Sequence, residues 1–130
     1  MDTKNNRLPE EILKAWEVRD PAAVLTTVSR EGVPNTVYVS CCGLVEPNRI
    51  LICDAKFGKT LENLRSGRPE VAFLFFAPDF AAYQLKGRVR YFAEGPILEA
   101  GKAFAKPDVE TRGVAEVEVT EVYKGSDRLM

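Results

Sequence analysis

Residues 48–64 carry the stretch that decides the fold, NRILICDAKFGKTLENL. Its apolar run at residues 50–53 is typical of a buried strand. The hydrophobic period then changes, because Leu61 and Leu64 have the spacing of one face of a helix. The chain between these two parts therefore connects a strand to a short helix that is expected to begin near Lys59.

The connection before this helix has the features of an anion site. The free amides in the first turn of a helix point outward, together with the positive end of the helix dipole. Gly58 allows close approach of the backbone, Thr60 supplies a hydroxyl group and Lys59 supplies a full charge. The same residues are also common at an ordinary solvated helix start, and the glycine-rich spacing of a Walker loop is missing. Both an anion site and a plain helix cap stay open from the residues alone.

Outward from this segment, the chain consists of short strands joined mostly by tight turns, such as the hairpin expected at Arg30-Glu31-Gly32, where the glycine is available for positive φ. Residues 1–19 predict a helical lead-in that ends at Asp20-Pro21. Strands are expected at residues 24–29, 35–42, 50–53, 71–76, 83–94 and 115–120, and further short helices at residues 59–66 and 97–105. Tight turns rather than crossover helices favour antiparallel pairing. The sequence therefore predicts one mainly β domain over residues 1–130, a six-stranded antiparallel β-barrel with short flanking helices.

Two of these strands have informative patterns. Gly87 lies in the middle of a long strand, where it predicts a bulge or a barrel bend. In the last strand, Glu116 and Glu118 alternate with apolar residues, which predicts an exposed face rather than a pair of catalytic carboxylates. The basic residues Arg88 and Arg90 also alternate, so that they form either a solvated face or an arm that reaches a neighbouring subunit.

Composition excludes several classes of function. Lys and Arg number 18 against 19 Asp and Glu, so no strong field favours nucleic acid or an anionic membrane. No apolar run approaches the roughly 20 residues of a membrane span, and the start, MDTKNNRLPEE, is too polar for a signal peptide. A cytoplasmic location is expected. The absence of histidine excludes His-based catalytic triads, His-ligated zinc and His-ligated haem, and no metal site is expected.

The cysteines and aromatic residues each allow two interpretations. Cys41, Cys42 and Cys53 are odd in number and two are adjacent, which argues against a disulfide framework. They are expected to be buried, reduced thiols, with a reactive thiol near a cofactor as the alternative. The aromatic residues favour a core, and some could instead line a subunit interface: Phe73, Phe75, Phe76, Phe80, Tyr91 and Phe92.

The order of these elements resembles the pyridoxamine 5′-phosphate oxidase-like family of FMN-binding split barrels, of the small FMN-binding protein type. The resemblance covers residues 20–123. It is strongest over residues 48–64, followed by the step RPEVAF at residues 68–73. The segment QLKGRV at residues 84–89 is similar to the glycine-centred strand that follows in the family.

This resemblance implies a split barrel, the cofactor FMN and a homodimer with FMN at the subunit interface. It implies that Lys59 and Thr60 hold the phosphate within the turn that includes Phe57 and Gly58. The other implied contacts are Asp54 and Ala55 along the ribityl chain, Val37, Tyr38, Val39 and Ser40 along the isoalloxazine ring, and Tyr83 and Gln84 as further residues that reach the flavin.

Two departures from the family affect the expected function. Phe57-Gly58 stands where the oxidases have a serine-arginine pair, and the C-terminal region that recognises pyridoxal-type substrates is absent, so oxidation of vitamin B6 is not expected. The expected function is electron or hydride transfer by FMN, as in a flavin-dependent oxidoreductase whose catalytic residues are unknown. Two alternatives stay open: a reductase that uses a deazaflavin such as F420, and a cofactor-free barrel that acts in binding or assembly.

Overall fold

The computed structural model describes residues 6–130, and the first five residues of the expected lead-in lie outside this range. Three helices occur within it: α1 (Glu10–Glu17), α2 (Lys59–Ser66) and α3 (Pro96–Lys102). Eight strands occur within it: β1 (Ala23–Val28), β2 (Pro34–Val39), β3 (Cys42–Val45), β4 (Arg49–Asp54), β5 (Arg68–Ala77), β6 (Ala81–Phe92), β7 (Gly113–Lys124) and β8 (Asp127–Arg128). No helix of this part of the chain is long and apolar enough to cross a membrane.

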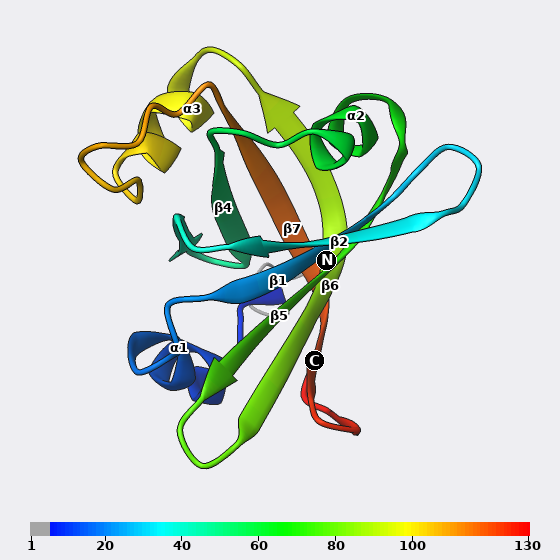
Figure 1. Ribbon diagram of the computed structural model, residues 1–130. Helices are drawn as coiled ribbons and strands as arrows, with labels where there is room; N and C mark the ends of the chain where they lie inside the picture. The colour runs from blue at the N-terminus through cyan, green and yellow to red at the C-terminus, as the bar shows by residue number, and fades with distance from the viewer. Residues whose placement is uncertain (1–5) are drawn as a thin grey trace.

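The strands form one curled antiparallel sheet. Its order is β2-β1-β5-β6-β7-β4-β3, and the short β8 pairs with β7. The two edge strands of this order, β2 and β3, are joined directly by Ser40 and Cys41. The chain thus crosses from one edge of the sheet to the other, while α1 lies at one end of the molecule and α2 and α3 lie near the other (Figure 1). This arrangement confirms the predicted mainly β split barrel with flanking helices.

Residues 6–130 contain eight strands where six were expected, because the expected strand at residues 35–42 is divided into β2 and β3 and because the two-residue β8 was not expected. Residues 34–39 pair with β1, whereas residues 42–45 pair with β4 at the opposite end of the sheet. One continuous strand cannot pair at both edges, so the chain must bend between them. A run of strand-forming residues has no local signal that marks this change of partner.

Two glycines act as expected. Gly32 has φ +92° in the hairpin between β1 and β2, a conformation that residues with a side chain rarely adopt. At Gly87 the register of β6 against β7 shifts, and a Cβ atom there would overlap the carbonyl oxygen of Glu118. The predicted bulge is therefore confirmed, and it exists because two backbones approach closely.

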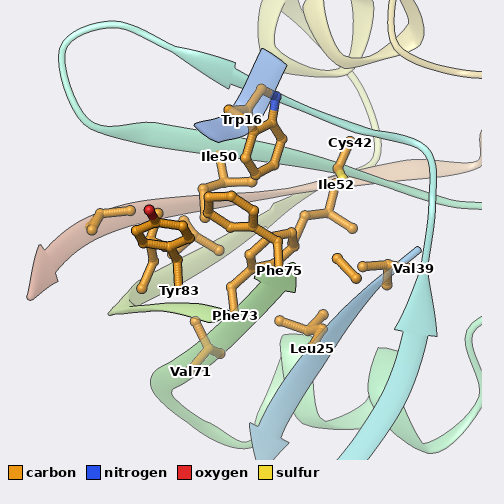
Figure 2. Close-up of a cluster of buried hydrophobic side chains, with 14 of the residues drawn as sticks. Trp16, Leu25, Val39, Cys42, Ile50, Ile52, Val71, Phe73, Phe75 and Tyr83 are labelled. Carbon is orange, nitrogen blue, oxygen red and sulfur yellow. The ribbon is translucent and has the colours of Figure 1, made fainter. Parts of the chain in front are cut away.

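The core fills the inside of the curled sheet. Trp16 of α1 contacts Phe73 and Phe75 of β5, with ring centroids 5.7 and 5.0 Å apart, and Cys42 lies among the same side chains beside Ile52 (Figure 2). These aromatic residues thus belong to the core. Phe80, in contrast, is fully exposed at the turn between β5 and β6. A second, smaller cluster packs α3 on the outer face of the sheet: Leu51, Leu98 and Val114.

The prediction that Glu116 and Glu118 lie on an exposed face of the last strand is correct for one of them and wrong for the other. Glu118 is exposed as expected, but only 4% of the Glu116 side chain is accessible. Its carboxylate oxygens accept from Arg49 at 2.9 Å and from Arg90 at 3.1 Å. The long arginine side chains come from the two strands that flank β7, and they cover this carboxylate. Alternation identifies the face of a strand, but it does not show what folds over that face.

Candidate functional site

A cleft of about 1110 Å³ opens where β2, the end of β4 and the start of α2 meet the loop between α3 and β7. The structure brings nine of the twelve predicted site residues to this one cleft: Val37, Tyr38, Val39, Ser40, Ala55, Phe57, Gly58, Lys59 and Thr60. These residues come from two segments that are far apart in the sequence. They converge because Ser40 and Cys41 link β2 directly to β3, the neighbour of β4, and because Asn35 of β2 donates to Thr60 of α2.

Asp54 lies beneath the cleft rather than in its wall. Its side chain is fully buried, and one carboxylate oxygen accepts the backbone N–H of Phe57 at 2.8 Å. The other oxygen accepts the hydroxyl of Tyr91 at 2.6 Å and Nε of Arg112 at 3.0 Å. Arg112 also donates to the carbonyl oxygen of Phe57. The turn before α2 is therefore held from both sides by a buried carboxylate and the guanidinium paired with it.

Tyr91 is held in its donor state at this position. Burial and its hydrogen bond to Asp54 raise the pKa of Tyr91 to about 12. Gly113 leaves the space that the tyrosine hydroxyl occupies, since a Cβ atom at that position would overlap it. The Tyr91 hydroxyl thus stays protonated at neutral pH and serves to fix Asp54.

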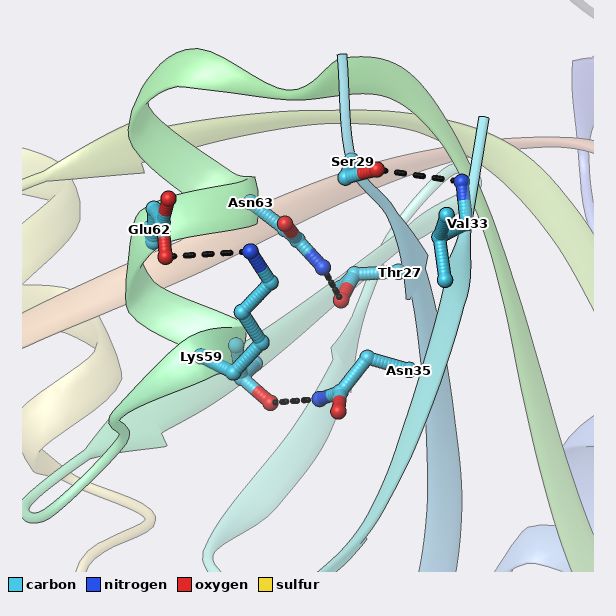
Figure 3. Close-up of polar contacts among 8 residues, drawn as sticks. Thr27, Ser29, Val33, Asn35, Lys59, Glu62 and Asn63 are labelled. Carbon is cyan, nitrogen blue, oxygen red and sulfur yellow. Dashed lines mark hydrogen bonds and ion pairs between the residues drawn. The ribbon is translucent and has the colours of Figure 1, made fainter. Parts of the chain in front are cut away.

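The start of α2 presents uncapped backbone amides to the cleft. Gly58 is its N-cap residue, and no side chain caps the helix. Lys59 extends from the first turn, where its Nζ lies 3.1 Å from Glu62 in an exposed pair (Figure 3). Thr60 is buried, and its Oγ1 accepts Nδ2 of Asn35 from β2 at 3.0 Å. A free helix start with a lysine and a threonine hydroxyl has the donors that a phosphate group requires.

The helix is also attached firmly to the sheet. Asn63 donates to the hydroxyl of Thr27 on β1 at 3.0 Å, and both side chains are buried (Figure 3). Together with the bond between Asn35 and Thr60, this contact fixes α2 against two strands. The amides of its first turn are therefore held in place before any ligand binds.

The residues before Lys59 differ in environment. Phe57 is half-buried and packs against the core, whereas Gly58 is exposed. A Cβ atom at Gly58 would meet nothing within 4 Å. The turn therefore has open space at Gly58, directly before Lys59.

The β2 wall of the cleft combines backbone groups with apolar side chains. Val39 is buried and Val37 is half-buried, while Ser40 is exposed. Tyr38 lines the cleft and is 78% exposed. A planar ring could pack against this wall, although much of the tyrosine surface is left for another contact.

Sequence reasoning missed two basic residues that enter the cleft from a distant segment. Arg112 and Lys106 come from the loop before β7, whereas Lys56 lies within the predicted connection between β4 and α2. Asp108 and Glu110 of the same loop partly offset this charge. The one sequence signal for Arg112 is its position directly before a strand. No local motif connects residue 112 to residue 54, so the ion pair between them could not be predicted.

Tyr83 and Gln84 lie away from the cleft. The hydroxyl of Tyr83 donates to Glu11 at 2.9 Å, in a separate groove where Lys124 pairs with the same carboxylate at 3.2 Å. The hydrogen bonds from Tyr83 and Lys124 lower the pKa of Glu11. Gln84 is half-buried on β6, where it pairs with neighbours on both sides of its strand. Within one copy of the chain these two residues are not brought to the cleft.

The three cysteines are all free. Cys42 and Cys53 are buried, as expected, and Cys41 is half-buried. Cys41 and Cys53 line the cleft, so the alternative interpretation, a reactive thiol near a cofactor, stays open for these two residues. Among residues 6–130, no three Cys, Asp or Glu side chains gather in a way that could hold a metal ion.

Comparison with known proteins adds a family to this geometry. Residues 8–124 match the family model described as pyridoxamine 5′-phosphate oxidase. An uncharacterized protein of Methanocaldococcus jannaschii is 32% identical over 123 residues, which cover 90% of this chain and 80% of that protein.

Two solved structures share the fold. An FMN-binding protein of Syntrophomonas wolfei subsp. wolfei has a TM-score of 0.74 at 14% identity, over 87% of this chain and 82% of that one. HutZ, the heme storage protein of Vibrio cholerae, has a TM-score of 0.63 at 12% identity, over 91% and 94% of the two chains. At such identities the likeness concerns the fold alone.

Proposed function

Because this chain belongs to the pyridoxamine 5′-phosphate oxidase family, we propose that it is a flavoprotein that binds FMN in the cleft between β2 and α2. The observation that supports this proposal is the convergence of the β2 wall and the α2 start on one cleft. An FMN-binding protein with the same fold agrees with it. The bound flavin would supply electron or hydride transfer, and the chain would position it.

The phosphate is proposed to bind at the start of α2. The uncapped amides there and the hydroxyl of Thr60 are fixed, while Lys59 is free to turn toward an anion because its exposed pair with Glu62 is weak. Arg112 brings a guanidinium to the same turn, 46% exposed. It would supply part of the charge that Phe57-Gly58 lacks relative to the serine-arginine pair.

The ring system is proposed to lie along β2, against Val37, Val39 and the backbone up to Ser40. Ala55 borders the path between the ring and the phosphate. Asp54 is buried beneath this path, so its proposed role is to hold the turn and not to touch the ribityl chain. No side chain of the cleft needs to act as a catalyst in this scheme, since the flavin carries the chemistry.

Haem is a weaker candidate for the same cleft. The fold is shared with a heme storage protein, but this chain has no histidine, and only Cys, Tyr or Met side chains could ligate the iron. The deazaflavin F420 would use the same groove, and its acidic tail could meet Lys56 and Lys106. In the cofactor-free alternative, the cleft would bind neither a flavin, nor F420, nor haem.

One spectrum separates these candidates. The protein is purified from a host that makes flavins, and its visible absorption is recorded before and after addition of FMN. The double-banded spectrum of oxidised flavin, with fluorescence quenched on binding, is the expected result. A Soret band would indicate haem, and a single deazaflavin band would indicate F420. A colourless protein that also fails to bind added FMN would leave only the cofactor-free barrel.

We also propose that the cleft is completed by a second copy of the chain. The large, mostly exposed side chain of Tyr38 lies on the edge strand β2 and in the cleft wall at once. A homodimer through this edge would cover the tyrosine and close the open side of the cleft.

Sedimentation velocity tests the dimer. The wild-type chain is expected to sediment as a dimer at micromolar concentration, and Tyr38→Arg is expected to shift it toward the monomer. Phe80→Ser serves as the control, because Phe80 is even more exposed than Tyr38 but lies in a separate groove. A monomeric wild type, or equal dissociation by both variants, would count against an interface at Tyr38.

A further inference from the structure

Cys41 and Cys53 lie directly opposite each other on neighbouring segments. The ladder between β3 and β4 pairs Cys42 with Ile52, and one step further places Cys41 opposite Cys53. The backbone N–H of Cys53 donates to the carbonyl oxygen of Cys41 at 2.8 Å, which extends the ladder to this pair. Opposite residues of an antiparallel pair have their side chains on the same face. Both side chains accordingly line the cleft.

Cys42 lies on the other face, although it is next to Cys41 in the sequence. Its side chain is in the core beside Ile52 (Figure 2), and burial raises the pKa of its thiol to about 11. It is therefore kept as an unreactive thiol. It cannot reach Cys53 without a reversal of the strand, which makes it an internal control.

The spacing of an opposite pair is close to that of a disulfide. Opposed residues that share ladder hydrogen bonds have Cα atoms about 5.5 Å apart, within the range of about 4.4–6.8 Å seen for disulfides. Their Cβ atoms must approach by roughly 1 Å to reach the usual disulfide distance. Cys41 can make this approach because it lies in the link between two edge strands, outside both of them.

We propose that Cys41 and Cys53 are a dithiol that forms a reversible disulfide in the wall of the cleft. The oxidant is a small-molecule disulfide. The thiolate of Cys41 attacks one of its sulfur atoms, so that its S–S bond breaks, a mixed disulfide forms and one small thiol leaves. The thiolate of Cys53 then attacks the sulfur of Cys41 and releases the second small thiol. Each protein thiol gives up one proton and each leaving thiolate takes one, so two electrons pass to the small disulfide.

The order of the two steps follows from exposure. Cys41 is half-buried, whereas only 8% of Cys53 is accessible and its Sγ donates to the carbonyl oxygen of Gly101 at 3.1 Å. Burial raises the pKa of the Cys53 thiol, so it is the slower group to ionise. Cys41 is thus the attacking thiol and Cys53 the resolving one. This redox site is independent of whether a flavin binds.

The test maps the bond in the full chain. Wild-type protein is incubated with oxidised glutathione, its free thiols are alkylated, and a tryptic digest is analysed by mass spectrometry without reduction. Trypsin cuts after Arg49, which separates Cys53 from the other two cysteines. A cross-linked pair of peptides that disappears on treatment with dithiothreitol is the expected product, with one alkylated cysteine in the peptide that contains Cys41 and Cys42.

Variants identify the partner of Cys53. The cross-link is expected to persist in Cys42→Ala and to be lost in Cys41→Ser and in Cys53→Ser, with circular dichroism to confirm that each variant is folded. The proposal is overturned if Cys42 is the residue bonded to Cys53, if the bond joins two copies of the chain, or if both thiols of the wild type stay fully alkylatable. Non-reducing gel electrophoresis of the oxidised wild type shows whether the bond joins two copies, and the wild-type digest shows whether the thiols stay alkylatable. Both points are therefore decided even where a variant fails to fold.

Discussion

Replacement of Asp54 by asparagine tests whether the buried carboxylate holds the turn before α2. Asparagine keeps the shape and can still accept the N–H of Phe57, but the amide nitrogen in place of the second oxygen can accept from neither Arg112 nor Tyr91. Hydrogen bonds to charged groups contribute about 1.5–3 kcal/mol each, against roughly 0.5–1.5 kcal/mol for neutral ones. Loss of the bonds donated by Arg112 and Tyr91, offset in part if the tyrosine hydroxyl turns to accept from the new amide, should lower the unfolding free energy by about 3 kcal/mol.

Urea denaturation followed by circular dichroism measures this loss, and Tm should fall by about 10 °C for a domain of this size. Asp108→Asn is the matched control, because Asp108 also lines the cleft but is exposed, and it should change the unfolding free energy by less than about 0.5 kcal/mol. Tyr91→Phe should cost about 2 kcal/mol, because it removes a hydrogen bond to a carboxylate, and the double variant with Asp54→Asn should lose less than the sum. An Asp54→Asn variant as stable as the wild type would refute the role assigned to the carboxylate.

Three further sites give shorter tests. Lys59→Ala should weaken FMN binding by about 1–3 kcal/mol in a fluorescence titration, through loss of a charge-assisted phosphate contact, while Gly58→Arg should strengthen binding, because the position is open and the new charge lies beside the same anion. Glu116→Gln should lower the unfolding free energy by about 2 kcal/mol, because the carboxylate is buried between two arginines, and Glu118→Gln should leave it unchanged within about 0.5 kcal/mol. Glu11 has a lowered pKa when folded, so its contribution to stability is present above its ordinary value of 4.5 and is lost as the pH falls through the folded value. Urea midpoints of Glu11→Gln should therefore decline less steeply on acidification than those of the wild type.

Each of these tests has an outcome that contradicts it. Unchanged FMN affinity in Lys59→Ala would place the phosphate elsewhere, and weaker binding in Gly58→Arg would mean that the turn itself contacts the ligand. Equal losses in Glu116→Gln and Glu118→Gln would show that burial of the first carboxylate is unimportant. Parallel acid profiles for Glu11→Gln and the wild type would show that this carboxylate titrates alike in the folded and unfolded states.

Local chemistry explains which parts of the fold could be predicted. The change of hydrophobic period between Ile52 and Leu61 correctly marked the strand and helix around the cleft. Gly32 and Gly87 correctly marked a turn and a bulge, because each needs a backbone that other residues cannot adopt or fit. These signals depend on a few neighbouring residues, so they can be read without tertiary contacts.

The features that the sequence did not predict depend on which strands are neighbours in the sheet. Nothing near Ser40 shows that the chain must change partners there, because that bend is imposed by β1 and β4. The burial of Glu116 and the approach of Arg112 to Asp54 likewise involve residues far apart in the sequence. The candidate site was therefore predicted along its two continuous segments and missed where a distant loop closes it.

The direct link between the edge strands β2 and β3 has a consequence for how a ligand would act on the whole molecule. The cleft is lined by residues on both sides of this link, from Val39 on one edge to Cys53 on β4. A molecule bound there would contact both sides of the split in the barrel at once. It would stabilise the folded state, because the unfolded chain does not bring these two sides together. Amide hydrogen exchange should then slow first in β2 and β3, on either side of the split, rather than in the central strands that are already protected by two neighbours.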